Sequence, residues 1–102
     1  MTASLSVIWW RDIPAQVSAR SGRVSARHVL PGRFQEAIDR AAVTAGLAGT
    51  DDYLAQWRRE TRPCTDDLDA EVRAEVKLLE SAYPAARLRQ LAAAGGLVGD
   101  AT

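Results

Sequence analysis

The sequence predicts an α+β fold: a small antiparallel sheet of three to four strands, with two to three helices packed mainly on one face. The first third of the chain alternates apolar and polar residues as strands do, and the last third carries apolar stripes at helical spacing. Strands followed by helices, rather than alternating with them, are typical of α+β folds. One domain is expected over residues 1–96, and residues 97–102, after Gly95-Gly96, are expected to form a flexible tail.

The first strand is expected over residues 4–12, and the sheet should form around it. Neighbouring side chains of a strand point to opposite faces, so Trp9 and Trp10 cannot share a pocket. Because both faces of the strand are apolar, it belongs in the middle of the sheet. A core on one face accounts for Trp9. Trp10 lies on the other face and is the better candidate for an interaction side chain.

A β-hairpin is predicted next, because the string Val-Ser-Ala-Arg begins at Val17 and recurs at Val24. A two-residue turn at Ser21-Gly22, with glycine supplying a positive φ, pairs Arg20 with Arg23. This register places the valines and alanines on one face and the serines and arginines on the other, as a half-buried hairpin requires. Its strands are expected over residues 15–20 and 23–30.

Three helices are expected, over residues 31–46, 66–83 and 85–94. Pro31 suits the first position of a helix, and Gly46 suits its end. Thr65 is expected to cap the second helix, whose first turn holds carboxylates that favour the helix dipole. The buried candidates recur at helical spacing: Phe34, Ala37, Ile38, Ala41, Ala45, Leu68, Val72, Val76, Leu79, Tyr83, Leu88, Leu91 and Ala92.

Residues 51–62 fit two structures. Tyr53, Ala55 and Trp57 alternate with Leu54, Gln56 and Arg58 as in a strand, but Tyr53, Leu54 and Trp57 also match a short helix. A strand over residues 53–61 is preferred because it would add to the sheet.

Composition excludes several classes of function. The 13 basic and 13 acidic residues cancel, which disfavours general binding to nucleic acid or to an anionic membrane. The apolar run from Leu5 to Trp10 is too short for a signal-peptide core or a membrane span. A single cysteine allows no internal disulfide and fits a reducing compartment, so a cytoplasmic location is expected.

Reactive groups are few and scattered. His28 is the only histidine and Cys64 the only cysteine, and neither has an evident catalytic partner. Asp66, Asp67 and Asp69 lack the spacing of a calcium loop and are explained by helix capping. We therefore expect no enzymatic activity, no metal and no cofactor.

Three stretches together resemble a known family: Ile8 to Val17 (IWWRDIPAQV), Arg33 to Ala41 (RFQEAIDRA) and Asp51 to Arg58 (DDYLAQWR). They resemble the small bacterial virulence factor domain, which occurs alone or at the end of a longer protein, conserved virulence factor C. The resemblance covers roughly residues 5–85 and supplies no catalytic residues. Stand-alone members are often encoded beside folate- and corrinoid-dependent one-carbon enzymes, which implies an accessory role.

The predicted function is therefore a non-enzymatic protein-interaction module, or an accessory subunit of a bacterial cytoplasmic complex linked to methyl-transfer enzymes. The candidate interaction residues are Trp10, Arg11, Asp12, Tyr53 and Trp57. The alternative is an anion-binding module for a phosphorylated metabolite or nucleic acid, because arginine suits phosphate. Its candidate residues are Arg20, Arg23 and Arg27. The expected partner is another protein of unknown identity, no membrane partner is expected, and a homo-oligomer is compatible with the sequence.

Overall fold

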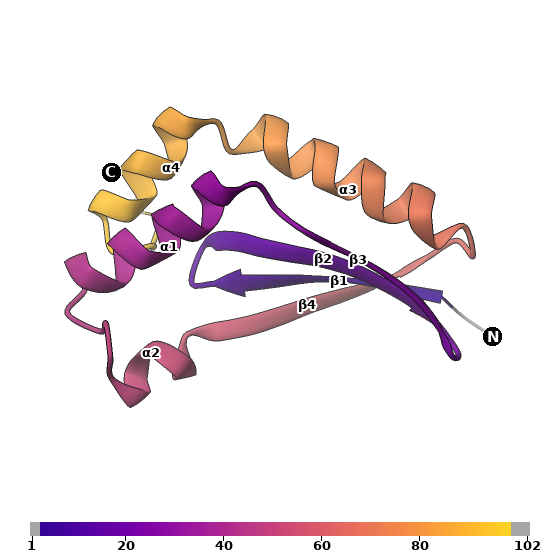
Figure 1. Cartoon of the computed structure of the whole chain (residues 1–102), viewed down its shortest axis with the longest axis horizontal. Helices are drawn as coiled ribbons and strands as arrows, with labels where there is room; N and C mark the ends of the chain where they lie inside the picture. The colour runs from indigo at the N-terminus through magenta and orange to yellow at the C-terminus, as the bar shows by residue number, and fades with distance from the viewer. Residues whose placement is uncertain (1–2, 99–102) are drawn as a thin grey trace.

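A computed structural model describes residues 3–98 and confirms the α+β class. Four antiparallel strands form one sheet in the order β3-β2-β1-β4. Figure 1 shows α1, α3 and α4 in one layer above the sheet and α2 at one end of it. The elements are β1 (Ala3–Trp10), β2 (Ile13–Ser21), β3 (Val24–Val29), α1 (Gly32–Thr44), α2 (Asp51–Ala55), β4 (Trp57–Cys64), α3 (Leu68–Ala82) and α4 (Ala85–Ala93).

The predicted central strand is confirmed, because β1 pairs with β2 on one side and with β4 on the other. Leu5 and Val7 face the helices and are buried. Val17 and Ala19 of β2 lie opposite them on the same face. This row of short and branched side chains forms the floor on which the helices pack.

The hairpin forms, but its predicted register is wrong by two residues. Ser21 pairs with Val24, and Arg20 faces Ser25 instead of Arg23. The two-residue loop is therefore Gly22-Arg23, with Gly22 at φ 60° in its first position, where a type II′ turn requires glycine. A shift of two residues keeps every side chain on its predicted face, so the division into apolar and polar faces holds.

The apolar stripes predicted for the helices are confirmed as the helical side of the core. Leu68, Val72, Val76 and Leu79 of α3 are buried, as are the predicted residues within α1 and α4. Ala45 and Tyr83, also predicted to be buried, are half-buried because they follow the last residues of α1 and α3. The caps differ from the prediction. Asp67, not Thr65, caps α3, since its carboxylate accepts a hydrogen bond from the Ala70 N–H at 3.3 Å. Pro31 is the cap of α1 and not its first residue.

The preference for a strand over residues 53–61 is wrong for its first part. Residues 51–55 form the helix α2, and β4 begins only at Trp57. Thr50 explains the helix, because its hydroxyl accepts from the Tyr53 N–H at 3.3 Å and Asp51 and Asp52 stand in the first turn. Both readings of this stretch were thus correct, each for one half.

The segment after α4 is held against the sheet as far as Val98, the last residue that the structure describes. The Val98 N–H donates to the Asp12 carboxylate at 2.7 Å. Of the predicted tail 97–102, residues 99–102 lie outside the described residues.

Candidate functional site

Trp10 is an internal anchor and not an interaction residue. Its side chain is 0% exposed, and its indole N–H donates to the Tyr53 carbonyl at 2.9 Å. The Tyr53 ring packs on it at a centroid distance of 5.5 Å, and Gly96 lies against its edge, with Ala41 of α1 beside Gly96. The prediction of an exposed Trp10 is wrong. Trp10 stands at the end of β1, where α1, α2 and the segment after α4 bury it without a helical layer on that face of the sheet.

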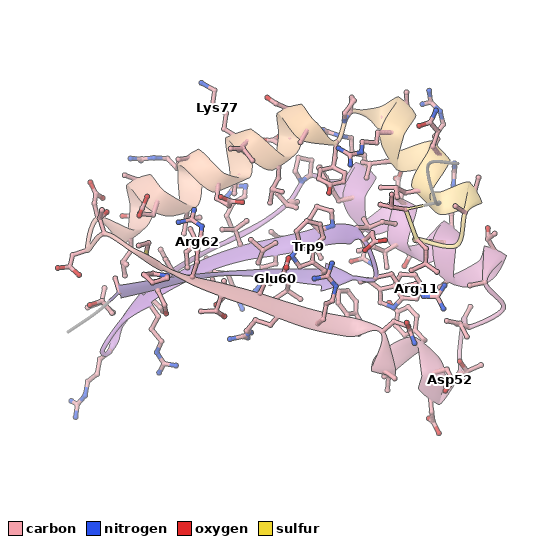
Figure 2. The ribbon with its side chains drawn as sticks, turned by 180° about the vertical axis from the view of Figure 1, so that it is seen from behind. Trp9, Arg11, Asp52, Glu60, Arg62 and Lys77 are labelled. Carbon is pink, nitrogen blue, oxygen red and sulfur yellow. The ribbon has the colours of Figure 1, made fainter. Side chains whose placement is uncertain are left out.

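Arg11 joins the end of β1 to two of these segments, the end of α2 and the segment after α4. Its guanidinium donates from Nε to the Gln56 side chain at 3.1 Å and from Nη1 to the Gly95 carbonyl at 3.0 Å. Its own backbone N–H donates to the Gln56 carbonyl at 3.1 Å. Figure 2 places Arg11 at the end of the sheet beside α2. Its guanidinium is therefore occupied by contacts within the chain.

Asp12 completes this clasp, the name used below for Trp10, Arg11 and Asp12. The Asp12 backbone N–H donates to the Gly96 carbonyl at 2.8 Å, and its carboxylate accepts from Val98. The side chain of Asp12 is 33% exposed and also lies 3.6 Å from Arg58. The most distinctive string of the sequence thus serves to fasten α2 and the C-terminal segment to the sheet.

Tyr53 and Trp57 are half-buried beside the clasp. Their rings meet edge to face at 6.1 Å, and burial raises the pKa of the Tyr53 phenol, with Asp39 adding to the effect. They pack the end of the sheet and present only part of their surface to solvent.

A second aromatic group lies at the junction of β1, β4 and the α3–α4 corner. Trp9 and Tyr83 meet edge to face at 6.1 Å. Arg58 stands over the Trp9 ring at 5.0 Å, and Arg87 stands over the Tyr83 ring at 4.3 Å. We call Arg58, Trp9, Tyr83 and Arg87 the aromatic–arginine row. Figure 2 shows Trp9 between the strands and the helical layer.

The aromatic–arginine row is partly exposed and carries an unsatisfied donor. Trp9 and Tyr83 are half-buried, and the Arg58 side chain is 42% exposed. The Trp9 indole N–H has no hydrogen-bond partner. Sequence reasoning missed Tyr83, Arg58 and Arg87 because they come from three separate elements. The sequence signal that could have identified this group is Tyr83 at the end of a predicted helix, followed four residues later by Arg87.

The predicted arginine face lies on the side of the sheet turned away from the helices, here called the uncovered face. Arg20 and Arg27 lie there, and Arg23 does not, because it is in the turn. Three rows of paired residues make up this face: Ser25-Arg20-Ser4-Pro63, Arg27-Ser18-Ser6-Thr61 and Val29-Gln16-Ile8-Arg59. These rows contain arginines and hydroxyls and no carboxylate.

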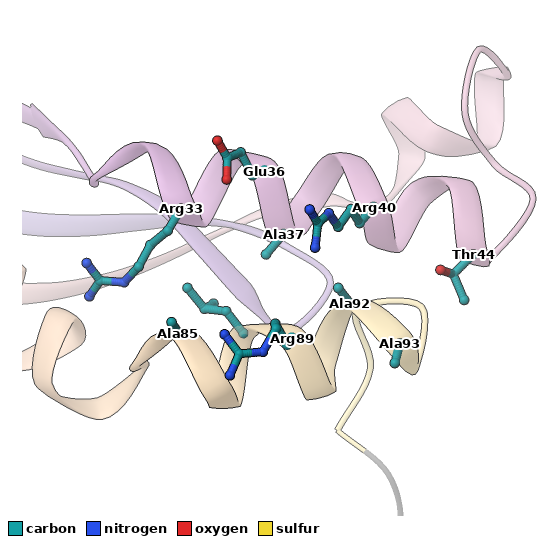
Figure 3. Close-up of a pocket in the computed structure, with 10 residues that line it drawn as sticks. Arg33, Glu36, Ala37, Arg40, Thr44, Ala85, Arg89, Ala92 and Ala93 are labelled. Carbon is teal, nitrogen blue, oxygen red and sulfur yellow. The ribbon is translucent and has the colours of Figure 1, made fainter.

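A groove of about 550 Å³ runs between α1 and α4. Figure 3 shows Arg40 alongside α1 and Arg89 alongside α4, with Arg33 at one end. Alanines from both helices line the rest of the groove together with Leu88. This groove has no counterpart in the sequence predictions.

Reactive side chains do not gather within residues 3–98. No group of three or more His, Cys, Asp or Glu residues there could hold a metal ion. Burial raises the pKa of the Cys64 thiol, and Glu71 adds to the effect, which disfavours the reactive thiolate. His28 is exposed on β3 opposite Val17, on the face where the hairpin pattern placed it.

None of the helices among residues 3–98 is long and apolar enough to cross a lipid bilayer.

The fold and its surfaces define a two-layer α+β domain in which a four-stranded antiparallel sheet carries its helices on one side. Residues 8–92 match the family model described as "Virulence factor", and the chain therefore belongs to the virulence factor family. This confirms the resemblance drawn from the three sequence stretches. No curated protein and no solved structure matches the chain.

Proposed function

We propose that this domain is a non-enzymatic protein-interaction module that docks on its partner through the aromatic–arginine row. The observation that carries the proposal is the composition of this row. Tryptophan, tyrosine and arginine dominate the residues that supply most of the binding energy at protein interfaces. Trp9 replaces Trp10 as the anchor, because Trp10 is used entirely inside the domain.

The row is also preorganised for binding. Each guanidinium is held over a ring, and Arg87 donates from Nη1 to the Ala82 carbonyl at 2.8 Å. Side chains that are already ordered lose less entropy when a partner arrives. Arg58 is partly neutralised by Glu60 at 3.2 Å, whereas no carboxylate among residues 3–98 lies within 4.0 Å of Arg87. An acidic group on the partner therefore fits opposite Arg87.

Stand-alone members of the family are often encoded beside one-carbon enzymes, and we therefore choose such an enzyme as the first partner to test. A folate- or corrinoid-dependent methyl-transfer enzyme encoded beside this chain would be the partner, and the domain would act as its accessory subunit.

Affinity purification from the native cell tests the proposal with two matched variants. Arg87→Glu reverses a charge in the row, and Arg73→Glu reverses the charge of an exposed arginine on α3 outside it. We expect the wild type and Arg73→Glu to recover the same partner. We expect Arg87→Glu to recover at least about tenfold less, as loss of a charged contact at an interface does. Recovery of the wild type alone, or equal recovery with Arg87→Glu, would refute the proposal.

The uncovered face favours a second candidate function, the binding of a phosphate-bearing ligand such as single-stranded nucleic acid or a phosphorylated metabolite. Arg27 is paired with Ser18 and Arg20 with Ser25, so each arginine has a hydroxyl-bearing residue as its cross-strand neighbour. Arg59 lies on the opposite outer strand, about 14 Å across the sheet at the usual strand spacing. The residues between these arginines include the short side chains of Ser4, Ser6 and Ser18.

Arg23 is the matched control for this candidate, because it belongs to the same hairpin but lies in the turn. Labelled single-stranded nucleic acid and a panel of phosphorylated metabolites would be titrated at several salt concentrations. We expect Arg20→Ala/Arg27→Ala to lose binding and reduce the salt slope by about 2, while Arg23→Ala changes little. An absence of binding by the wild type at low salt would eliminate this candidate.

A further inference from the structure

We propose that the groove between α1 and α4 binds a small phosphate monoester. The site begins with the spacing of residues along α1. Arg33, Ala37, Arg40 and Thr44 recur at intervals of three or four, so they form one side of the helix. Small residues on α4 line the middle of the groove, and α4 also contributes Arg89 to the lining (Figure 3).

The size of the groove suits a small molecule. Its volume of about 550 Å³ lies within the range of about 300–1,000 Å³ that ligand pockets occupy. The uncovered face, by contrast, is a flat sheet surface on which a polymer would have to lie. The two surfaces are on different sides of the domain, since the groove lies in the helical layer and the uncovered face is on the other side of the sheet.

The charge of the groove identifies the ligand class. Three arginines line it, and within residues 3–98 no carboxylate lies within 4.0 Å of Arg33, Arg40 or Arg89. Glu36 is the one acidic residue of the lining, and Figure 3 shows its carboxylate pointing away from α4. The lining therefore has a net charge of +2, which matches a phosphate monoester of charge about −1.5 to −2 at neutral pH.

Glu36 competes only weakly for these arginines. It stands four residues before Arg40 on α1, but the two side chains form no ion pair within 4.0 Å. The Arg40 guanidinium therefore keeps its donors available for the bidentate hydrogen bonds that arginine makes to phosphate.

Arg33 fixes a positive charge at one end of the groove. Its guanidinium lies over the Phe34 ring at 4.8 Å, and Nη2 donates to the Glu80 carbonyl at 3.2 Å. A guanidinium held in place by the fold favours an anion nearby.

The start of α4 adds to the positive potential at the same end. Ala85 lines the groove and is the first residue of α4, and Pro84 provides no side-chain cap. The first N–H groups of α4 therefore lack an acceptor from the cap and favour a negative charge nearby.

The floor of the groove distinguishes an ester from free phosphate. Ala37, Leu88 and Ala92 present methyl groups between the two arginine-bearing walls. A compact apolar group attached to the phosphate would cover these methyl groups, and its own transfer out of water would favour binding. The site should thus prefer a monoester with an aromatic or branched body to inorganic phosphate.

Nuclear magnetic resonance titration of the full chain tests the site with phenyl phosphate, inorganic phosphate and benzyl alcohol as probes. We expect phenyl phosphate to shift amide signals of α1 and α4 with a saturable dependence, inorganic phosphate to bind several-fold more weakly, and benzyl alcohol not to bind. Arg40→Gln/Arg89→Gln should weaken phenyl phosphate binding by at least about tenfold, because two charged donors are lost.

Arg20→Gln/Arg27→Gln is the matched control, since it removes the same charge from the uncovered face and should keep the wild-type affinity. All four arginines are exposed, so both double variants should keep the wild-type circular dichroism spectrum. Equal loss of binding in the two double variants would overturn the proposal, as would signal shifts confined to the strands. Equal affinity for inorganic and phenyl phosphate would reduce the groove to an adventitious anion site and would overturn it as well.

Discussion

Arg11 is held in a backbone conformation that residues other than glycine rarely adopt. Its φ of 54° lies in the left-handed region, and it is the one such non-glycine residue among residues 3–98. This conformation costs about 1–2 kcal/mol. The hydrogen bonds of Arg11 to Gln56 and Gly95 offset that cost and explain why arginine, and not glycine, stands there.

Two substitutions of Arg11 separate strain from bonding. Arg11→Ala removes the side-chain bonds and keeps the strain, so we expect the free energy of unfolding to fall by about 1–3 kcal/mol. Arg11→Gly removes the same bonds but relieves the strain, and should be about 1 kcal/mol more stable than Arg11→Ala. Urea denaturation measures both values. An alanine variant as stable as the glycine variant would show that the backbone at this position is unstrained.

The two tyrosines of the chain report burial through their ionisation. Burial raises the pKa of Tyr83, although Arg87 partly opposes the effect, and burial also raises the pKa of Tyr53. The folded state therefore favours the neutral phenols. Their contribution to stability is complete below pH about 10, the pKa in unfolded chains, and is lost as the pH rises through the higher folded values.

Alkaline titration of tyrosinate absorbance checks this expectation. The midpoint for the folded chain should lie above that of the chain in denaturant, and Tyr83→Phe should leave one delayed transition. Coincident midpoints in the two solvents would contradict it.

The end of α4 shows how one element positions another. Gly95-Gly96 was predicted only as a stop signal, but Gly96 also lies against Trp10. A Cβ built at Gly96 would lie 2.9 Å from Trp10 Cζ3, and the φ of Gly96 is +86°. Glycine is thus required there twice, for its backbone conformation and for the space that Trp10 occupies.

Gly96→Ala should therefore be more costly than another glycine substitution at positive φ. We expect it to lower the free energy of unfolding by about 2–5 kcal/mol, from the sum of backbone strain and overpacking. Gly46→Ala is the control, since its φ is +74° and nothing lies within 4 Å of the added Cβ. It should cost about 1–2 kcal/mol. Equal losses in thermal and urea unfolding would mean that the segment moves freely away from Trp10.

The limits of prediction at the scale of elements have a physical cause. The alternation in the hairpin identified both strands and both faces, because a slip of one residue would invert every side chain. A slip of two residues leaves the faces unchanged, so the pattern could not choose between Ser21-Gly22 and Gly22-Arg23 as the loop. In residues 51–62 a five-residue helix next to a strand lies below the length at which periodicity separates the two.

At the scale of the whole molecule, the sequence identified the aromatic residues but not their environments. A one-sided helical layer was predicted and is present, yet Trp10 is buried and Trp9 is half-buried. The difference arises at the end of the sheet, where α1, α2 and the C-terminal segment meet through contacts such as Arg11 to Gly95, 84 residues apart in sequence. Local patterns carry no information about which distant segments close around a strand end. The aromatic–arginine row and the α1–α4 groove escaped prediction for the same reason.

Trp10 connects the end of β1 to segments distant in sequence, and its loss should affect the whole fold. Its ring lies against Tyr53 of α2 and Gly96 after α4. Trp10→Ala would open a large cavity where these elements meet, at a cost of about 3–5 kcal/mol. That is a large part of the 5–15 kcal/mol typical of a domain, so the variant should unfold at low urea. Trp57→Ala, at a half-buried position of the same sheet end, should cost clearly less. Urea denaturation followed by circular dichroism compares the two, and a Trp10→Ala variant as stable as Trp57→Ala would show that Trp10 does not hold these elements together.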